Sequence, residues 1–322
     1  MSIDVVTLGE AMVGLVASDV GPLAEARRFE PHVAGAEANV AVGLARLGHR
    51  AAFIGRVGSD GFGTAIVRRL RGEGVDVANL RVDPDARTGI FVRERRLVGP
   101  ADLVYHRAGS AGSRLAPDDV AAAADRFVGD GWLHVTGITP ALSPSCRAAV
   151  EAAIVRAREA GMTISLDVNL RRKLWSDDEA GPVLRAIVAG CDVVFASLDE
   201  ADVILGAPAD SANEAARGLL EMGPSLAVLK LGEAGAIARE RDRPGATHEG
   251  FGVPLVIDPV GAGDAFVAGF IAARLEGHNL ATALAWGNAG GASVAAAVGD
   301  MTGLPTRAEL EAIIASGPDT VR

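Results

Sequence analysis

The stretch Asp258-Pro-Val-Gly-Ala-Gly-Asp264 leads directly into the apolar run Ala265-Phe-Val-Ala-Gly-Phe-Ile-Ala-Ala273. The run predicts a helix over residues 264–276, and the residues 255–257 before the turn are expected to be extended. The glycines that flank the alanine allow successive backbone N–H groups to point the same way. Such a turn at a helix N-terminus binds anions. The sequence therefore predicts an anion hole at residues 261–263.

Asp264 lies in the first turn of this predicted helix, beside the anion hole. A bound anion repels a carboxylate, so a specific role has to explain the residue. One interpretation is a general base that takes the proton from a hydroxyl attacking a bound phosphoryl group. The other is a carboxylate favoured only by the helix dipole, and these residues alone do not separate the two. The dipole is expected to keep Asp264 ionised at neutral pH.

The composition predicts a large apolar core and an acidic surface. The chain has 322 residues, of which 49% are hydrophobic, and a net charge of −10. This length suits one large α/β domain or two smaller ones. No dense basic stripe occurs, and the mixed charges of residues 93–96 are typical of a solvated strand. Nucleic acid and anionic membranes are therefore not expected as partners.

Other features of the sequence predict a cytoplasmic protein. Cys146 and Cys191 are far apart and are expected to be buried thiols in a reducing compartment. The first ten residues are typical of a strand and carry no secretory signal. The uncharged run 279–299 is long enough to cross a bilayer, but its polar residues favour a pair of buried helices.

Short β-branched runs alternate with alanine-rich runs along the chain. The predicted strands are residues 4–8, 51–57, 131–135, 163–167, 193–196 and 227–231. The predicted helices are residues 37–47, 63–72, 143–160, 182–188, 213–222 and 264–276. This alternation predicts a mostly parallel sheet with helices on both faces.

Two segments, at about 10–33 and 88–107, alternate apolar and polar residues without a following helix. We expect short antiparallel strands there, which combine into a small sheet on the main domain. This sheet is a lid in one interpretation and an oligomer-forming flap in another, and the two are compatible.

Two familiar nucleotide-binding motifs are absent. No Gly-x-x-x-x-Gly-Lys-Ser/Thr loop occurs, which excludes a P-loop NTPase. No Gly-x-Gly-x-x-Gly follows the first strand, which disfavours a dinucleotide dehydrogenase. The turn before Asp264 is therefore the predicted phosphate-binding device.

Two further segments carry a family resemblance. Residues 35–48 read Gly-Ala-Glu-Ala-Asn-Val-Ala-Val-Gly-Leu-Ala-Arg-Leu-Gly, and residues 55–63 read Gly-Arg-Val-Gly-Ser-Asp-Gly-Phe-Gly. They resemble the N-terminal signature of the PfkB (ribokinase-like) sugar kinases, and residues 258–266 resemble the C-terminal signature. The resemblance implies one kinase domain over 1–322 with ATP and Mg²⁺. The implied fold is a three-layer α/β sandwich with a mostly parallel central sheet and an antiparallel β lid.

The resemblance also implies site residues. Catalysis is assigned to Asp264 as base and to Gly261, Ala262 and Gly263 as anion hole. Substrate binding is assigned to Gly35, Ala36, Glu37, Ala38, Asn39, Phe91, Tyr105, His106, Arg107, Asn169, Arg171 and Asp300. Nucleotide binding is assigned to Ser197, Lys230, Gly232, Gly235, Gly261, Gly263 and Asn288, and Glu200 is expected to organise Mg²⁺ indirectly. Without the resemblance, Asn39 is interpreted as a helix cap and Asn288 as a polar position on a buried helix.

The lid and mid-chain motifs indicate the substrate. Residues 105–113, 137–143 and 167–175 resemble those of 2-keto-3-deoxygluconate kinases. A sugar acid brings a carboxylate that pairs with arginine, so Arg107 is assigned to it and Arg171 to the transferring phosphate. The alternative for Arg107 is an ordinary surface charge. The predicted reaction transfers the ATP γ-phosphoryl group to the primary hydroxyl of 2-keto-3-deoxygluconate, giving 2-keto-3-deoxy-6-phosphogluconate.

Departures from the family pattern leave alternatives open. Phe91 replaces a tyrosine, which relaxes discrimination between epimers, and Ser197 replaces an asparagine. Residues 258–260 replace Asp-Thr-Thr, so a monovalent cation such as K⁺ is an option only. The alternatives are a neutral-sugar kinase of fructokinase or ribokinase type and a nucleotide-binding regulator without turnover. A homo-oligomer through the lid strands is also expected.

Overall fold

The computed structural model describes residues 3–96, 99 and 101–317, and its central feature is a nine-stranded sheet of order β13-β12-β11-β10-β9-β8-β1-β4-β5. The strands are β1 (Val5–Leu8), β4 (Ala51–Gly58), β5 (Leu80–Asp83), β8 (Trp132–Thr136), β9 (Thr163–Asp167), β10 (Val193–Ala196), β11 (Leu226–Lys230), β12 (Ala236–Glu240) and β13 (Ala246–His248). Neighbouring strands are parallel except for β11–β12 and β12–β13, which are antiparallel. The predicted mostly parallel sheet is confirmed.

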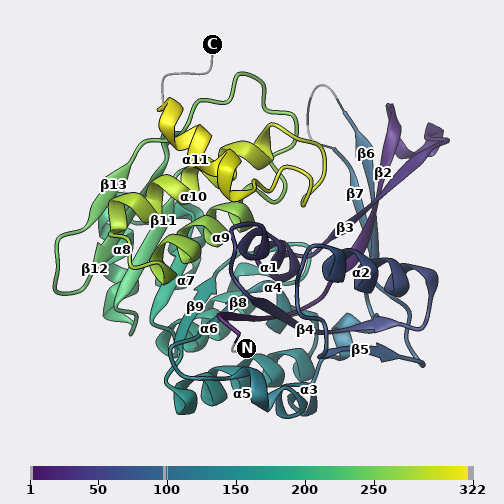
Figure 1. Cartoon of the computed structure of the whole chain (residues 1–322), viewed down its shortest axis with the longest axis horizontal. Helices are drawn as coiled ribbons and strands as arrows, with labels where there is room; N and C mark the ends of the chain where they lie inside the picture. The colour runs from purple at the N-terminus through teal and green to yellow at the C-terminus, as the bar shows by residue number, and fades with distance from the viewer. Residues whose placement is uncertain (1–2, 97–98, 100, 318–322) are drawn as a thin grey trace.

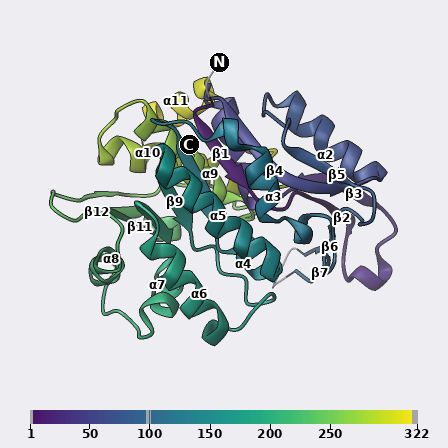
Figure 2. The same ribbon diagram turned by 90° about the horizontal axis from the view of Figure 1, so that it is seen from below.

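Helices cover both faces of this sheet (Figures 1 and 2). One face packs against α1 (Ala36–Arg46), α2 (Gly61–Gly72), α9 (Ala262–Leu275), α10 (Leu280–Ala295) and α11 (Arg307–Ser316). The other packs against α3 (Pro117–Ala122), α5 (Pro144–Ala160), α6 (Asp177–Ala189), α7 (Leu198–Leu205) and α8 (Ala212–Glu221), and α4 (Ile138–Leu142) precedes α5. Successive strand residues point to opposite faces, so Val5 joins one core and Val6 the other. This is the three-layer sandwich that the sequence predicts.

Three local predictions differ from the structure. Helix α6 begins at Asp177, before the predicted 182, because Ser176 and Glu179 form a capping box. Residues 279–299 do not form a helix pair, because α10 runs uninterrupted from the Asn279 cap to Ala295. Residues 255–257 form no strand, and their side chains are exposed.

A second, four-stranded sheet lies beside the β4–β5 edge of the main sheet (Figure 1). Its order is β3-β2-β6-β7, with β2 (Met12–Val20), β3 (Phe29–Ala34), β6 (Ile90–Arg95) and β7 (Leu103–His106). The pairs β2–β3 and β6–β7 are antiparallel as expected, and a parallel contact between β2 and β6 joins them. The Phe91 ring lies against Gly14, where an added Cβ would come within 2.2 Å of it.

The apolar lengths of the helices and the burial of the two cysteines are also defined. No helix in the described ranges is both long and apolar enough to cross a membrane. Cys146 and Cys191 are free and buried, as predicted. Burial raises the pKa of the Cys146 thiol to about 11 and that of Cys191 to about 12, so neither is a reactive thiolate near neutral pH.

Candidate active site

Charged side chains gather where the parallel strands end. Glu10 follows β1, Asp167 ends β9 and Lys230 ends β11, while Glu200 lies in the first turn after β10. In open α/β sheets, ligands bind at the carboxyl ends of parallel strands. The fold therefore brings residues from distant segments to one ligand-binding edge.

The N-terminus of α9 has the geometry of an anion hole. Gly261 caps the helix with a φ of +86°, and a Cβ there would meet the Asp300 carbonyl oxygen at 2.9 Å. Only glycine fits this position without strain. The backbone N–H groups of Gly263 and Asp264 have no acceptor among the described residues, and the Ala265 N–H bonds to Gly261. Free donors at a helix N-terminus favour a bound anion.

Asp264 lies beside these donors, with 6% of its surface exposed. The Asn39 amide donates to its Oδ2 at 2.7 Å, and the Asn169 amide donates to its Oδ1 at 3.2 Å. Asn169 has a φ of +41°, which is strained for a non-glycine residue and typical of functional sites.

The surroundings of Asp264 set its protonation near neutral pH. Burial raises the pKa of its carboxyl to about 7, and the neighbouring Asp167 adds to the rise. The Asn39 hydrogen bond and the Arg171 charge act in the opposite direction. The sequence-based expectation was that the helix dipole keeps Asp264 ionised at neutral pH; burial instead brings its pKa close to neutral pH, so both protonation states are accessible there.

Lys230 supplies a fixed positive charge close to the anion hole. Its Nζ donates to both carboxylate oxygens of Asp167, at 2.6 and 2.8 Å. A Cβ at Gly263 would lie 3.5 Å from the same Nζ. Burial opposes the charge on Lys230, but Asp167 and Glu200 outweigh burial and raise its pKa. Lys230 is thus charged at neutral pH.

Two side-chain oxygens next to Asp264 have no hydrogen-bond partner. They are the buried Oδ1 atoms of Asn39 and Asn169. The side-chain amide group of each asparagine donates a hydrogen bond to Asp264, and the amide oxygen of the same side chain remains free to accept one. A ligand hydroxyl beside Asp264 would satisfy them.

The other residues of 35–39 face different surroundings. The Glu37 carboxylate accepts hydrogen bonds from the hydroxyls of Thr136 and Thr139, both at 2.6 Å. Burial raises the pKa of Glu37. The side chain of Ala38 is fully buried in the core, so the structure does not bring it to the site. Gly35 and Ala36 lie at the start of α1.

Arg107 follows β7 and is buried, which excludes the alternative of a surface charge. Its Nε donates to Glu10 Oε2 at 2.8 Å, and its Nη2 lies 2.6 Å from the same oxygen. The guanidinium carbon lies 5.4 Å from the Tyr105 ring centre, and Tyr105 contacts Phe91. The Glu10 carboxylate also accepts from Ser110. By contrast, His106 is exposed.

Glu200, which was assigned to the metal, and Ser197 both lie at the start of α7 and have partners within the chain. Glu200 accepts from the N–H of Leu170 and from the N–H of Ser197, both at 2.8 Å. The Ser197 hydroxyl donates to Asp199 at 2.5 Å. Within the described part of the chain, no group of three or more His, Cys, Asp or Glu residues could hold a metal ion.

The residues assigned to the nucleotide base lie around a turn after β11. Gly235 has a φ of +92°, and a Cβ there would meet the His248 carbonyl oxygen at 2.1 Å. The Asn288 amide donates to the carbonyls of His248 and Glu249, at 3.1 and 3.0 Å. Asn288 therefore holds the segment that covers the turn of Gly232 and Gly235.

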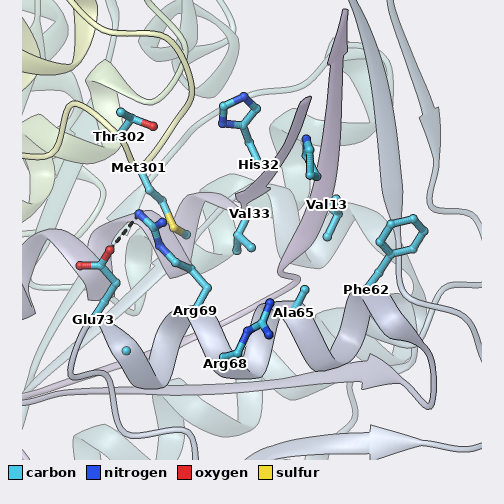
Figure 3. Close-up of a pocket in the computed structure, with 12 residues that line it drawn as sticks. Val13, His32, Val33, Phe62, Ala65, Arg68, Arg69, Glu73, Met301 and Thr302 are labelled. Carbon is cyan, nitrogen blue, oxygen red and sulfur yellow. Dashed lines mark ion pairs between the residues drawn. The ribbon is translucent and has the colours of Figure 1, made fainter. Parts of the chain in front are cut away.

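A cavity of about 680 Å³ lies between α2, β3 and the segment after Asp300 (Figure 3). His32, Arg69 and Met301 are among its lining residues, and Arg69 is ion-paired with Glu73 at 2.8 Å. None of the predicted site residues lines it. The cavity is thus a feature separate from the anion hole.

Comparison with known families agrees with this geometry. The family description "pfkB family carbohydrate kinase" matches residues 2–307. The chain belongs to the pfkB family of carbohydrate kinases.

Two curated relatives of the kinase have the same name. It is 38% identical to the 2-dehydro-3-deoxygluconokinase of Bacillus subtilis (strain 168), over 98% of this chain and 97% of the relative. It is also 38% identical to the 2-dehydro-3-deoxygluconokinase of Thermoproteus tenax, over 97% and 94%.

Solved structures share the fold of the kinase. A putative ribokinase II from E. coli in complex with ATP and Mg²⁺ has a TM-score of 0.88 and 28% identity, over 98% of this chain and 99% of that one. A fructokinase double mutant from Vibrio cholerae O395, in a form that binds fructose, ADP and a potassium ion, has a TM-score of 0.83 and 32% identity, over 97% and 99%.

Sequence reasoning missed several charged residues of the kinase. Glu10, the partner of Arg107, and Asp167, the partner of Lys230, were not assigned to the site. Both lie at or just after the carboxyl end of a predicted strand, and this position is the signal that would have found them. Arg93 was expected on a solvated strand, but it is ion-paired with Asp258 and largely buried.

Proposed function

We propose that the kinase transfers the γ-phosphoryl group of ATP to the primary hydroxyl of 2-keto-3-deoxygluconate, giving 2-keto-3-deoxy-6-phosphogluconate. The observation that carries this proposal is the position of Asp264. Its carboxylate lies beside the free N–H groups of α9, and its pKa is about 7. A base with a pKa near the working pH is suited to accept a hydroxyl proton. A regulator without turnover has no use for this arrangement.

In the proposed reaction, Asp264 accepts the proton of the attacking hydroxyl. The free oxygens of Asn39 and Asn169 flank the carboxylate and would accept from substrate hydroxyls. The N–H groups of Gly263 and Asp264 and the Lys230 ammonium would stabilise the negative phosphoryl oxygens. Gly261 and Ala262 shape this turn.

Arg171 is a second cation for the phosphoryl group. Its side chain is exposed, has no hydrogen bond or ion pair with a described residue, and acts on Asp264 electrostatically. We therefore assign it to the transferring phosphate. Asp300, whose carbonyl oxygen packs against Gly261, would position the turn.

Mg²⁺ would be held mainly by the phosphates of ATP, with Glu200 contributing through water, and would neutralise phosphoryl charge. The site fits this mode because both Glu200 oxygens already accept backbone donors. The adenosine would lie over the turn of Gly232 and Gly235, beside the segment that Asn288 holds and near Ser197.

Two observations support a sugar acid as the substrate. Both reported curated relatives are named for 2-dehydro-3-deoxygluconate, which is another name for 2-keto-3-deoxygluconate. Arg107 keeps one terminal nitrogen, Nη1, free of the Glu10 contact, and this nitrogen can bind a substrate carboxylate. Tyr105, Phe91 and His106 lie on the neighbouring strands β6 and β7 and would bound this end of the substrate.

One observation favours a neutral-sugar kinase instead. The positive charge of Arg107 is already balanced by Glu10, so the site has less attraction for a substrate carboxylate. Phe91 also lacks a hydroxyl for substrate recognition. A neutral sugar of the fructose or ribose type is therefore the second candidate.

A panel of substrates separates the candidates. ADP formation from ATP is measured with 2-keto-3-deoxygluconate, its galacto epimer, gluconate, fructose and ribose, and Asp264→Asn serves as the inactive control. We expect kcat/KM for 2-keto-3-deoxygluconate to exceed that for fructose and ribose by about a hundredfold, the order of a lost charge-assisted contact. A higher kcat/KM for fructose or ribose would mean that the substrate is a neutral sugar. If no sugar leads to ADP formation, the remaining candidate is a nucleotide-binding regulator without turnover.

We also propose that the small sheet is a lid, that it joins copies of the chain in a homo-oligomer, and that the kinase is cytoplasmic. The outer strands β3 and β7 each have one neighbour in the sheet, and they carry the exposed side chains Phe29 and Val104. The free thiols and the use of ATP support the proposed cytoplasmic location. Light scattering of the protein, compared with a Phe29→Asp variant, tests the oligomer.

A further inference from the structure

A buried ion pair connects the small sheet to the anion hole. Arg93, on β6, donates through Nη1 to Asp258 Oδ1 at 3.0 Å and through Nη2 to Asp258 Oδ2. The two side chains are 12% and 9% exposed, and their positions are 165 residues apart in sequence. A bidentate pair of this kind fixes the two partners in both distance and orientation.

The Asp258 carboxylate is fully engaged by donors. In addition to Arg93, the N–H of Val260 donates to Oδ1 at 3.2 Å, and the N–H of Gly299 donates to Oδ2 at 3.4 Å. Val260 leads directly into the Gly261 turn, and Gly299 precedes the Asp300 carbonyl against which Gly261 packs. The pair therefore holds both sides of the turn that presents the anion hole.

Arg93 also balances a second buried acid. Asp300 is buried, which raises the pKa of its carboxyl, while Arg93 lowers that pKa and Asp258 raises it. Other titratable groups near this place are Asp264, whose pKa is raised by the charge of Asp300, and His32 on β3, whose Nδ1 lies against Gly299. Buried carboxylates need a compensating charge. Arg93 is the cation that faces both acids.

The same place is where the family resemblance allows a monovalent cation, and the fructokinase structure described above contains a potassium ion. A potassium ion binds through oxygen atoms, and the Asp258 carboxylate is the charged oxygen ligand before the turn. In this chain both of its oxygens already accept from the guanidinium. The residues present therefore do not fit a cation at Asp258.

We infer that Arg93 supplies a fixed positive charge at Asp258, next to the Gly261 turn, so that this kinase works without a monovalent cation. Of the two measurements that test this inference, only the rate of ADP formation depends on the proposed function. Arg93 is a positioning residue: it acts through Asp258 on the Gly261 turn and anchors β6 to that turn. Removing the guanidinium would expose the Asp258 oxygens to a potassium ion.

The test compares K⁺ with tetramethylammonium, which is too large to enter such a site, at equal ionic strength. The variants are Arg93→Ala and Arg95→Ala. Arg95 is a matched control because it lies on the same strand, is exposed, and its side chain has no hydrogen bond or ion pair with a described residue. Melting temperature and the rate of ADP formation are both measured. Binding of an ion to the folded state alone raises the melting temperature.

We expect wild type and Arg95→Ala to have the same melting temperature in the two salts and rates that differ by less than about twofold. We expect Arg93→Ala to melt at a higher temperature in K⁺ and to lose roughly tenfold or more of its rate in tetramethylammonium, with K⁺ restoring at least about half of that loss on a logarithmic scale. Stabilisation or activation of wild type by K⁺ overturns the inference, and so does an Arg93→Ala variant that ignores K⁺.

Two further measurements keep the outcome decisive. If Arg93→Ala does not fold in either salt, Arg93→Gln, which keeps more of the side-chain volume, is judged by the same criteria, and the wild-type comparison stands by itself. If no sugar is phosphorylated, the proposed function fails, but the melting temperatures still decide whether Arg93 replaces the cation.

Discussion

The side-chain amide of Asn39 donates a 2.7 Å hydrogen bond to the carboxylate of Asp264, although the two residues are 225 positions apart. The contact joins the first turns of α1 and α9, and Asn169 holds the other carboxylate oxygen at 3.2 Å. Amide donors favour the ionised carboxylate, whereas burial favours the protonated one. Their balance gives a pKa of about 7, which lets Asp264 exchange a proton near neutral pH.

Replacing Asp264 by Asn tests the proposed base. We expect kcat to fall by roughly 10²–10⁴-fold, the usual contribution of a positioned base, while ATP still binds because the N–H groups of α9 remain. Steady-state kinetics and calorimetric titration with MgATP measure the two effects. Near-full turnover in this variant would remove Asp264 from the mechanism.

The pH dependence of the reaction follows from the raised pKa. Asp264 accepts a proton only when it is ionised, so kcat/KM is expected to fall about tenfold per pH unit below a pKa of about 7. The plateau lies on the alkaline side. A profile of kcat/KM that stays flat down to about pH 5 would contradict this assignment, because that quantity reports the free enzyme.

The folding stability should depend on Asp264 in the opposite direction to the activity: activity needs the ionised carboxylate, whereas the protonated carboxyl favours the folded state. Its pKa is raised from 3.8 to about 7, so the folded state binds the proton more tightly than the unfolded state within that window. The contribution of Asp264 to stability is therefore greatest at low pH and is lost as the pH rises through about 7. Above this pH we expect Asp264→Asn to unfold with a free energy larger by on the order of a few kcal/mol.

Urea unfolding of wild type and Asp264→Asn at several pH values measures this difference. The gap between the two proteins should shrink as the pH falls toward the unfolded-state value. The new amide has a ready acceptor, since Asn39 Oδ1 has no partner. A variant that is less stable than wild type above pH 7 would show that the carboxylate is not destabilised by its burial.

Arg107→Gln tests the recognition of a substrate carboxylate. We expect KM for 2-keto-3-deoxygluconate to rise by roughly 10–100-fold, while KM for any accepted neutral sugar changes much less, because only the acid loses a charge-assisted contact. The single variant also leaves Glu10 buried without its cation, which costs about 3–5 kcal/mol of stability.

The double variant Glu10→Gln/Arg107→Gln is the control for that loss, since it removes both charges. It should recover most of the stability in urea unfolding but keep the raised KM for the sugar acid. Equal changes in KM for acidic and neutral sugars would show that Arg107 does not bind a carboxylate.

Much of the architecture was predictable from local patterns. The strand at residues 163–167 and the strand at 193–196 match β9 and β10 residue for residue. Boundaries shifted where a cap decided them, as at Ser176 before α6. The run 279–299 was divided wrongly into two helices. Gly287 and Gly290 do not interrupt α10 but allow it to pack closely on α9.

The sequence by itself determined the parallel sheet, the anion hole at Gly261 and the place of Asp264 beside it. These features depend on side-chain periodicity and on backbone angles, which a few neighbouring residues fix. Only the tertiary structure decided that Asp264 titrates near neutral pH and that Glu10 holds Arg107 and Arg93 holds Asp258. The energy of a buried charge depends on the groups that surround it in space, and here those groups come from distant parts of the chain.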